Sequence, residues 1–410
     1  MKGASTRIRH AALAGLVGSA LLAACDEGPF LVSGVVIGSL SLTPASLAIA
    51  LQETDSVTLE VFDEEGQILL GQRASWVSEN PAVATVEGRA GGATVTAVAE
   101  GLTRIQVTVG QTVAFLDVEV FVSAFDIEVR YLGTPPTAGQ RAVFDDAVSF
   151  WRSAIVGDLA DFNADIAAGE CGGVDAPQVQ ETIDDLLIFV DFQDIDGAGG
   201  TLGSAAPCWL RSSTLTPFMG GMAFDNADLP NLEASGNLES TVRHEMGHVL
   251  GIGTLWGQGF FDLLVNPSDT AFGGTLGADA HFNGPLAIAA FNGAGGSGYP
   301  DAKVPVENDA DTYGSGSLDG HWRESVMVTE LMTPSLNGGG SNPTSAITIQ
   351  SLADMGYEVN LGAADPYTVA NPLSAFEGPP LRQIWIGNDI PRSAIGVMDE
   401  NGRVVRILRR

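Results

Sequence analysis

Residues 244–248 form a His-Glu-x-x-His motif, and this spacing suits a metal centre. Side chains four positions apart lie on one face of an α-helix, so His244 and His248 can both contact a single zinc ion. Glu245 can take a proton from a metal-bound water and so produce the hydroxide that attacks a peptide carbonyl. The alternative is a pair of surface histidines, but Val249 and Leu250 continue the apolar side of the helix. The motif therefore predicts a zinc hydrolase.

The third zinc ligand is not obvious from the motif. A catalytic zinc site uses three protein ligands and keeps a fourth position for water. The chain has five histidines, one of them within its first ten residues, so His281 and His321 remain besides the motif pair. Gly251 fits the pattern H-E-x-x-H-x-x-G-x-x-H, in which the glycine turns the chain toward the metal. The last histidine of that pattern is missing, because Thr254 occupies its position.

Residues further along the chain resemble the leishmanolysin family of metzincin proteases. In that family a long insertion separates the glycine from the third histidine, and a methionine turn lies beneath the metal. His321 matches the delayed ligand, and Met332, in Glu-Leu-Met-Thr-Pro at 330–334, matches the methionine. Residues 345–357 also resemble the helix that follows in bacterial members. The likeness covers roughly residues 125–370.

The resemblance implies a site built around one catalytic Zn²⁺. Its ligands would be His244, His248 and His321, and Glu245 would be the catalytic base. Gly251 and Met332 would be structural residues beside the site. The implied fold is an α+β metzincin-type protease domain over residues 124–370.

Two other ligand sets remain open. His281 competes as third ligand, but no methionine like Met332 follows it closely, so we favour His321. A zinc protease of another class would take a glutamate from a later helix, which makes Glu324 or Glu330 a candidate. The glycine and the methionine of the motif argue against that class.

The cysteines indicate export and one disulfide. Residues 11–24 are an apolar run behind a basic start, and Leu-Ala-Ala-Cys at 22–25 resembles a bacterial lipoprotein signal. We expect a signal peptide at 1–24, lipidation of Cys25 and a linker at 25–35, with an ordinary signal peptide as the alternative. Cys171 and Cys208 then form a disulfide worth about 3 to 4 kcal/mol, or stay as two buried thiols. The protein is expected at a bacterial cell envelope, and the sequence does not say at which membrane.

The cysteine count also bears on whether the protease is made as an inactive precursor. Eukaryotic leishmanolysins resemble zymogens in which a propeptide cysteine blocks the zinc. Once Cys25 is assigned to the signal, no cysteine is left before the protease domain. We do not expect latency by that route.

Residues 36–122 alternate apolar and polar residues in short runs separated by turns, as a small antiparallel sandwich requires. Leu-Thr-Pro at 42–44 and the segment from Trp76 to Val86 resemble a bacterial Ig-like domain of group 2. We expect an all-β Ig-like sandwich that acts as a spacer rather than as a specific binder. The chain is thus predicted to be multidomain, with this sandwich preceding the protease domain.

The remaining elements follow from hydrophobic periodicity. The sequence predicts strands at 125–131 and 185–192, an edge strand at 218–224, and a late strand pair at 383–386 and 394–398 within a carboxyl-terminal segment, 371–410, of unknown role. Helices are predicted at 138–159, 238–251, 285–291 and 344–355. Residues 255–318 read as a long glycine-rich loop.

The charge of the chain excludes one class of partner. The formal net charge of −31 would repel phosphate backbones, so nucleic acid is not an expected ligand. Asp301, Asp309 and Asp311 could serve Ca²⁺, but acidic loop tips are common and we assign no calcium site.

These features together predict a zinc metalloendopeptidase. Its partners would be protein or peptide substrates and, through the lipid at Cys25, a membrane. The alternative is a surface adhesion protein with a structural or inactive zinc site, and a third reading is a zinc hydrolase acting on another amide. Cleavage specificity depends on loops that the sequence does not place.

Overall fold

The computed structural model describes residues 36–51, 54–122, 124–270, 273–299, 303–338, 340–369 and 383–409. The predicted signal peptide, Cys25, the linker 25–35 and Asp301 lie outside the described residues. None of the helices in the described ranges is both long and apolar enough to span a bilayer. The described chain is predominantly β and multidomain.

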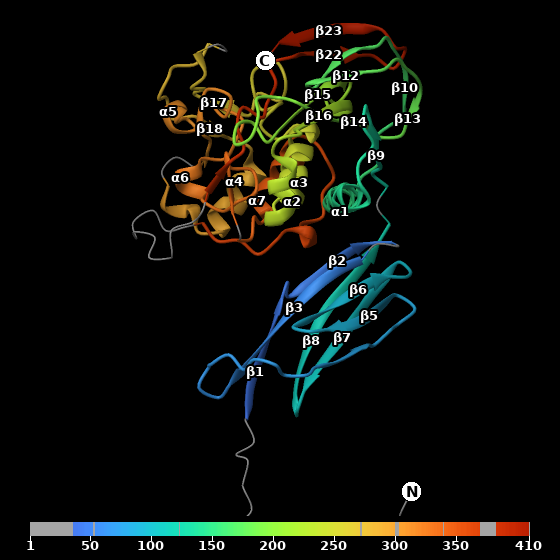
Figure 1. Ribbon diagram of the computed structural model, residues 1–410, viewed down its shortest axis with the longest axis vertical. Coiled ribbons are helices and arrows are strands. Elements are labelled where there is room, and N and C mark those ends of the chain that lie inside the picture. Colours follow the sequence, from blue (N-terminus) through green and yellow to red (C-terminus); the bar gives the residue numbers. More distant parts are fainter. Residues whose placement is uncertain are drawn as a thin grey trace, which may run out of the picture. The chain divides into compact units, whose positions relative to one another are not determined.

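Residues 37–121 fold into two four-stranded sheets (Figure 1). The sheet orders are β1-β3-β6-β5 and β2-β8-β7-β4. Side chains at alternate positions, such as Val57, Val95, Ile105 and Leu116, are buried together between the sheets. The strands are β1 Ile37–Thr43, β2 Ser46–Ala50, β3 Thr54–Asp63, β4 Ser75–Ser78, β5 Ala84–Arg89, β6 Gly92–Ala97, β7 Gly101–Val109 and β8 Thr112–Phe121.

A six-stranded mixed sheet organises the residues after 125, in the order β23-β22-β15-β16-β14-β9 (Figure 1). Strands β9, β14 and β16 run parallel, whereas β15 is antiparallel to β16. Strand β22 pairs in parallel with β15 and antiparallel with β23. The strands are β9 Ile127–Tyr131, β14 Leu186–Gln193, β15 Gly203–Arg211, β16 Pro217–Asp225, β22 Ala394–Met398 and β23 Val404–Arg409.

The predicted edge strand at 218–224 is wrong in its position, because β16 lies between β14 and β15 and all of its residues are buried. Its paired glycines have a packing reason. A Cβ on Gly221 would lie 2.0 Å from the carbonyl oxygen of Cys171, so only glycine admits that backbone over the sheet. The glycines of β16 thus mark the place where the backbone around Cys171 lies close against the sheet.

Two long helices cover one face of this sheet. They are α1 Ala138–Ala154 and α3 Leu238–Leu250, and α3 packs on β15 and β16. Ile188 and Val190 of β14 share a core with Trp151 of α1. The predicted helix 138–159 is too long, because Ile155 has extended backbone (φ −110°, ψ 121°) and pairs with Val359.

The opposite face of the sheet carries two small β-ribbons. Leu187 and Phe189 of β14 point to this side, where they share a core with Cys171 and Cys208. These cysteines form the predicted disulfide, with Cα atoms 4.9 Å apart. The ribbons are β10 Phe162–Ile166 with β13 Val179–Ile183, and β11 Gly169–Cys171 with β12 Val174–Ala176.

Apart from α3, the elements between 229 and 385 are short. The region predicted as a glycine-rich loop holds a three-stranded sheet of two-residue strands, β17-β18-β19, and the helix predicted at 285–291 is confirmed as α4. The two late strands do not pair with each other, because β21 pairs with β20 and β22 joins the main sheet. The elements are α2 Leu229–Ser235, β17 Leu264–Val265, β18 His281–Phe282, α4 Pro285–Gly293, β19 Val304–Pro305, α5 Ala310–Tyr313, α6 Glu324–Met327, β20 Ser335–Asn337, α7 Ala346–Asp354, β21 Gln383–Trp385, and the 3₁₀ turns Gly296–Gly298 and Leu361–Ala363.

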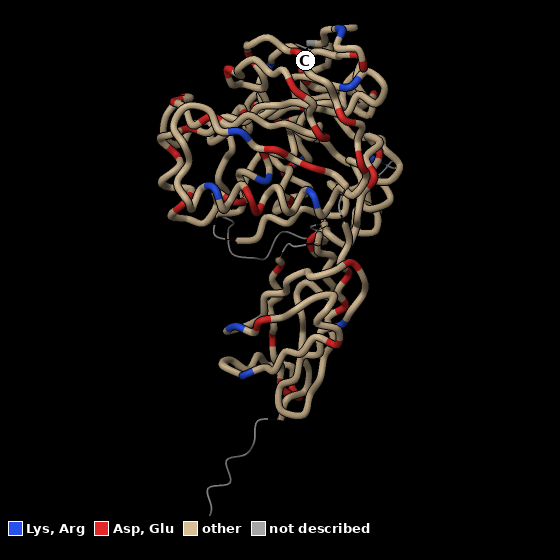
Figure 2. Tube along the Cα trace, turned by 90° about the vertical axis from the view of Figure 1, so that its right-hand side faces the viewer, with Lys and Arg blue, Asp and Glu red and all other residues tan. Residues whose placement is uncertain are grey.

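Acidic residues outnumber basic ones along the described chain (Figure 2). The sequence has 50 aspartates and glutamates against 19 lysines and arginines, and the tube in Figure 2 carries red segments in most of its parts.

Candidate metal centre

Helix α3 carries His244, Glu245 and His248, all of them 0% exposed. The helix ends two residues after His248, because Gly251 has a φ of 112°, a left-handed conformation that favours glycine. Thr254 does not point at the cluster. Its hydroxyl donates to the carbonyl of His248 at 2.7 Å and so satisfies an acceptor at the end of the helix.

His321 reaches the helix from a loop 73 residues beyond His248. A close backbone contact brings this loop in, since a Cβ on Gly253 would lie 1.8 Å from the carbonyl oxygen of Gly320. Gly253 also has a φ of 72°, so both space and conformation require glycine there. The turn after α3 therefore fixes the residue that precedes His321.

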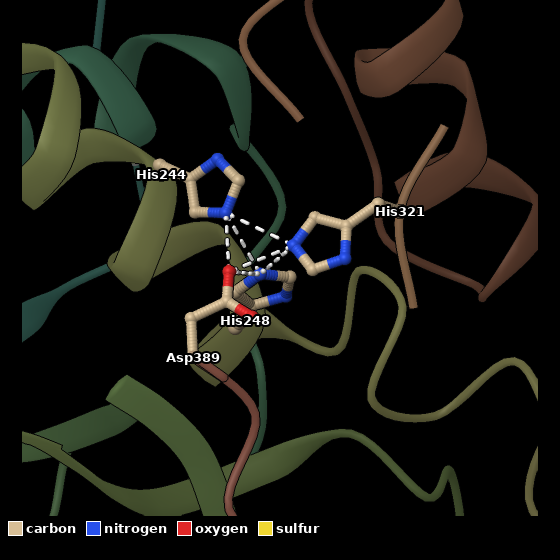
Figure 3. Close-up of side chains that lie close together, drawn as sticks. All are labelled: His244, His248, His321 and Asp389. Carbon is tan, nitrogen blue, oxygen red and sulfur yellow. Dashed lines mark hydrogen bonds and ion pairs between the residues drawn. The ribbon is translucent and has the colours of Figure 1, made fainter. Parts of the chain in front are cut away.

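The Nε2 atoms of the three histidines and Oδ2 of Asp389 converge on one point (Figure 3). The nitrogens of His244, His248 and His321 are 2.9 to 3.3 Å apart, and Oδ2 lies 2.8 to 3.5 Å from each of them. Atoms about 3.1 Å apart at the corners of a tetrahedron lie about 1.9 Å from its centre, close to the Zn–N and Zn–O distances of about 2.0 Å. The spacing of the four atoms fits a zinc ion.

The second nitrogen of each ring fixes its tautomer. Nδ1 of His244 lies 2.7 Å from the carbonyl oxygen of Leu331, and Nδ1 of His248 lies 2.8 Å from that of Ile252. Nδ1 of His321 lies 3.1 Å from the carbonyl oxygen of Ser317, which belongs to the same loop. A carbonyl only accepts, so each Nδ1 must carry the hydrogen.

The chemistry of the four converging atoms also suits a cation. With hydrogen on Nδ1, each neutral ring turns an Nε2 lone pair inward. Burial lowers the pKa of His244 and lowers that of His248 to about 3, although the neighbouring carboxylate opposes both shifts. The centre is therefore lined by lone pairs of hydrogen-bond acceptors, with no hydrogen between them. A metal ion bound among them would accept these lone pairs.

Asp389 is the member that the sequence did not predict. It is 0% exposed and belongs to the segment 371–410 to which no role was assigned. Because each ring carries its hydrogen on Nδ1, none of the three histidines donates to Asp389, and its carboxylate can act as a further metal ligand. No spacing motif singles it out among 50 acidic residues, and only the fold brings it to the histidines.

Glu245 lies beside the cluster and is not part of it. Both of its carboxylate oxygens are buried and lack a hydrogen-bond partner within the described residues. Burial, followed by repulsion from Asp389, raises the pKa of Glu245 well above its usual value. A Cβ on Gly203, at the start of β15, would lie 3.1 Å from Cγ and Oε1 of Glu245, so glycine there leaves the carboxylate room. A buried carboxylate without a partner is costly, which makes Glu245 a candidate for a functional role.

Met332 packs beneath the helix that carries the ligands. It is 0% exposed, and a Cβ on Gly247 would lie 3.0 Å from its sulfur. The same Cβ would lie 3.3 Å from the indole ring of Trp151. Gly247 therefore lets the methionine and the tryptophan contact the helix backbone between the two histidines.

The other candidate ligands lie elsewhere. His281 contacts the carbonyl of Asp279 and is not in the cluster. Glu330 accepts hydrogen bonds from Ser345 and from the N–H of Met332, so its role is to hold the methionine turn. Glu324 accepts from Gln383, and Asp309 caps helix α5. Asp309 and Asp311 are not among the groups of ligand atoms that the described residues bring together.

Comparisons with known proteins identify the first part of the chain. Residues 37–120 match the family of bacterial Ig-like domains (group 2), which confirms the prediction for this segment. Among curated proteins, none matches this chain.

Similar solved structures include an S-layer protein and an adhesin. The crystal structure of domains 4 and 5 of the S-layer protein SbsC is 23% identical, with a TM-score of 0.20, over 22% of this chain and 53% of that one. The adhesin InvE of Yersinia pseudotuberculosis is 14% identical, with a TM-score of 0.17, over 36% of this chain and 47% of that one. The chain thus spans about half the length of these two structures. Likeness at these TM-scores carries no argument about function.

Proposed function

We propose that this protein is a zinc-dependent endopeptidase of the metzincin type, similar to leishmanolysin. The observation that carries the proposal is the convergence of three Nε2 atoms, from His244, His248 and His321, beside the buried carboxylate of Glu245. A zinc ion held there would polarise a substrate carbonyl and lower the pKa of a water. The α+β fold of residues 124–370 and the packing of Met332 under α3 support the same assignment.

Glu245 would move the proton. Its carboxylate takes a proton from the water that attacks the scissile carbonyl carbon, and then gives it to the leaving amine nitrogen. Burial favours the first half of this cycle, because a raised pKa makes the carboxylate a stronger base toward the proton of the water. The backbone carbonyls of Leu331 and Ile252 hold the rings of His244 and His248 in the ligating tautomer throughout.

One observation favours a second function, an adhesion protein with a structural zinc site. Asp389 supplies a fourth protein atom, and structural sites are closed by four protein ligands. Glu245 argues against this reading, because a structural site gains nothing from a buried carboxylate that has no partner beside it. We therefore keep the endopeptidase as the leading function.

The location of the protein is a further part of the proposal. A lipid on Cys25 would tether the chain at a bacterial envelope, and the Ig-like domain would act as a spacer behind residues 124–370. Protein or peptide substrates would be the partners. Labelling with a radioactive or alkyne-bearing fatty acid should mark the wild type but not Cys25→Ala, and equal labelling of both would refute the anchor.

Peptide hydrolysis tests the chemical assignment. Because Asp389 takes the fourth corner, the assay compares Asp389→Ala with the double variant that also carries Glu245→Gln. Loss of a general base costs roughly 100- to 10,000-fold in rate. A peptide-library digest should therefore show cleavage by the first protein and at least about 100-fold slower cleavage by the second. Equal rates, or no cleavage by either zinc-loaded protein, would overturn the proposed function.

A further inference from the structure

The segment 383–390 runs along the edge of β15 and ends at the metal centre. The N–H of Leu202, just before β15, donates to the carbonyl of Ile386 at 2.8 Å, and the N–H of Ala205 donates to that of Asp389 at 2.8 Å. Strand β22 continues this path and pairs with residues 209–211. An open strand edge is a place where an extended peptide can bind. Here the carboxyl-terminal part of the chain fills that edge.

The other side of the same segment contacts the chain around the ligands. The N–H of Ile386 donates to the carbonyl of Pro334 at 3.1 Å, two residues after the buried methionine. The N–H of Gly316 donates to Oδ1 of Asn388 at 3.1 Å. Residues 386–389 are thus held between β15 and the loops that carry the third histidine and the methionine.

The fit of the segment is close. Ile386 and Asp389 are 0% exposed. Gly387 has a φ of 109°, and a Cβ there would lie 2.4 Å from Cα of Thr201. Any side chain at 387 would meet backbone that cannot swing away.

Asp389 presents a carboxylate to the histidines rather than a peptide bond. Its main-chain carbonyl accepts from the N–H of Ala205, whereas Oδ2 lies 2.8 Å from Nε2 of His321. A carboxylate is a good zinc ligand but not a substrate for hydrolysis. The segment therefore covers the edge of β15 and supplies a metal ligand at the centre.

We propose that residues 383–409 hold this protein in an autoinhibited state, with Asp389 as the ligand that closes the metal centre. The inference rests on the proposed function and adds its regulation. Removal or displacement of the segment frees both the fourth metal position and the edge of β15. The three histidines and Glu245 are already in place, so activation needs no further catalytic or metal-binding residue.

The test uses the full chain loaded with Co²⁺ and titrated with acetohydroxamate, a small bidentate metal ligand. Binding is read from the visible spectrum of cobalt, so the assay does not depend on proteolysis. The apparent Kd of a site rises by the inverse of the fraction that is open. If the wild type is open for about 1% of the time or less, Asp389→Ala should bind acetohydroxamate at least about 100-fold more tightly than the wild type.

A second variant tests the segment without touching a ligand. Gly387→Ala keeps all four metal-binding side chains but places a Cβ against Thr201, so it should tighten acetohydroxamate binding and speed amide exchange in 383–398. Gly293→Ala is the matched control, because a Cβ at that exposed glycine meets nothing within 4 Å. The control should bind like the wild type.

Three outcomes would overturn the inference. The first is acetohydroxamate binding by the wild type as tight as by Asp389→Ala. The second is loss of bound metal from Asp389→Ala, which would make Asp389 an essential member of a closed structural site. The third is a folded Gly387→Ala protein with wild-type exchange and binding. If the open variants bind metal and acetohydroxamate as expected but cleave no peptide, the proposed peptidase function fails, whereas closure of the metal centre by Asp389 stands.

Discussion

The contact between Gly247 and Met332 predicts a strong energetic coupling between two residues that sit under the metal ligands. Replacing Met332 with alanine empties a fully buried site and should cost about 2 to 5 kcal/mol of unfolding free energy. Gly247→Ala has two opposing effects. Alanine in a helix interior gains about 1 kcal/mol, but a Cβ placed 3.0 Å from the methionine sulfur and 3.3 Å from Trp151 overpacks the site at a cost of about 1 to 3 kcal/mol.

The two changes together should cost less than their sum. In the Met332→Ala background the new methyl group enters the vacated space, so Gly247→Ala should become neutral or stabilising. A double-mutant cycle should then give a coupling of about 1 to 3 kcal/mol. Urea unfolding at a fixed zinc concentration measures it through tryptophan fluorescence, since five of the six tryptophans lie after residue 125. Additive effects within about 0.5 kcal/mol would refute the packing argument.

Three further predictions concern pH, the disulfide and the end of the ligand helix. Burial, with repulsion from Glu307, raises the pKa of Glu324 from 4.5 to about 7, so the protonated form favours folding. That stability is present in full below pH 4.5 and falls by up to about 3 kcal/mol as pH rises through 7, and Glu324→Gln should flatten this slope in urea titrations from pH 5 to 8. An unchanged slope would contradict the assignment. Replacing Cys171 and Cys208 with alanine should lower stability by about 3 to 4 kcal/mol, measured by urea unfolding, without changing zinc content; a loss of zinc would show that the bridge shapes the site. Thr254→Val should cost about 1 kcal/mol by leaving the carbonyl of His248 without its hydroxyl donor, and a Tm equal to that of the wild type would refute the capping role.

The sequence predicted the elements that have strong periodicity. The Ig-like strands, the helix at 238–251 and the strand at 185–192 follow from alternation or helical spacing, and the structure has them within a few residues. Strand β15 was not predicted because small residues and Pro207 give Gly-Ser-Ala-Ala-Pro little strand character. Strand β16 was taken for an edge because its glycines look like weak points, whereas they admit the backbone of Cys171.

The residues of the site also divide into those that a sequence pattern indicates and those that only the fold brings together. His244, Glu245 and His248 follow from one helical motif, and the methionine and His321 were found only through a family resemblance. Asp389 could not be found from spacing, because it lies 68 residues beyond His321 and reaches it through sheet pairing of β22 with β15. A ligand that depends on long-range strand order leaves no local pattern in the sequence.

The zinc content of the purified protein tests the central claim most directly. Elemental analysis should find about one zinc per chain in the wild type and in His281→Ala. His321→Ala removes one of the three converging nitrogens and should lose most of its zinc after dialysis against a weak chelator. Zinc retained by His321→Ala, or lost from His281→Ala, would contradict the assignment of the centre to His244, His248 and His321.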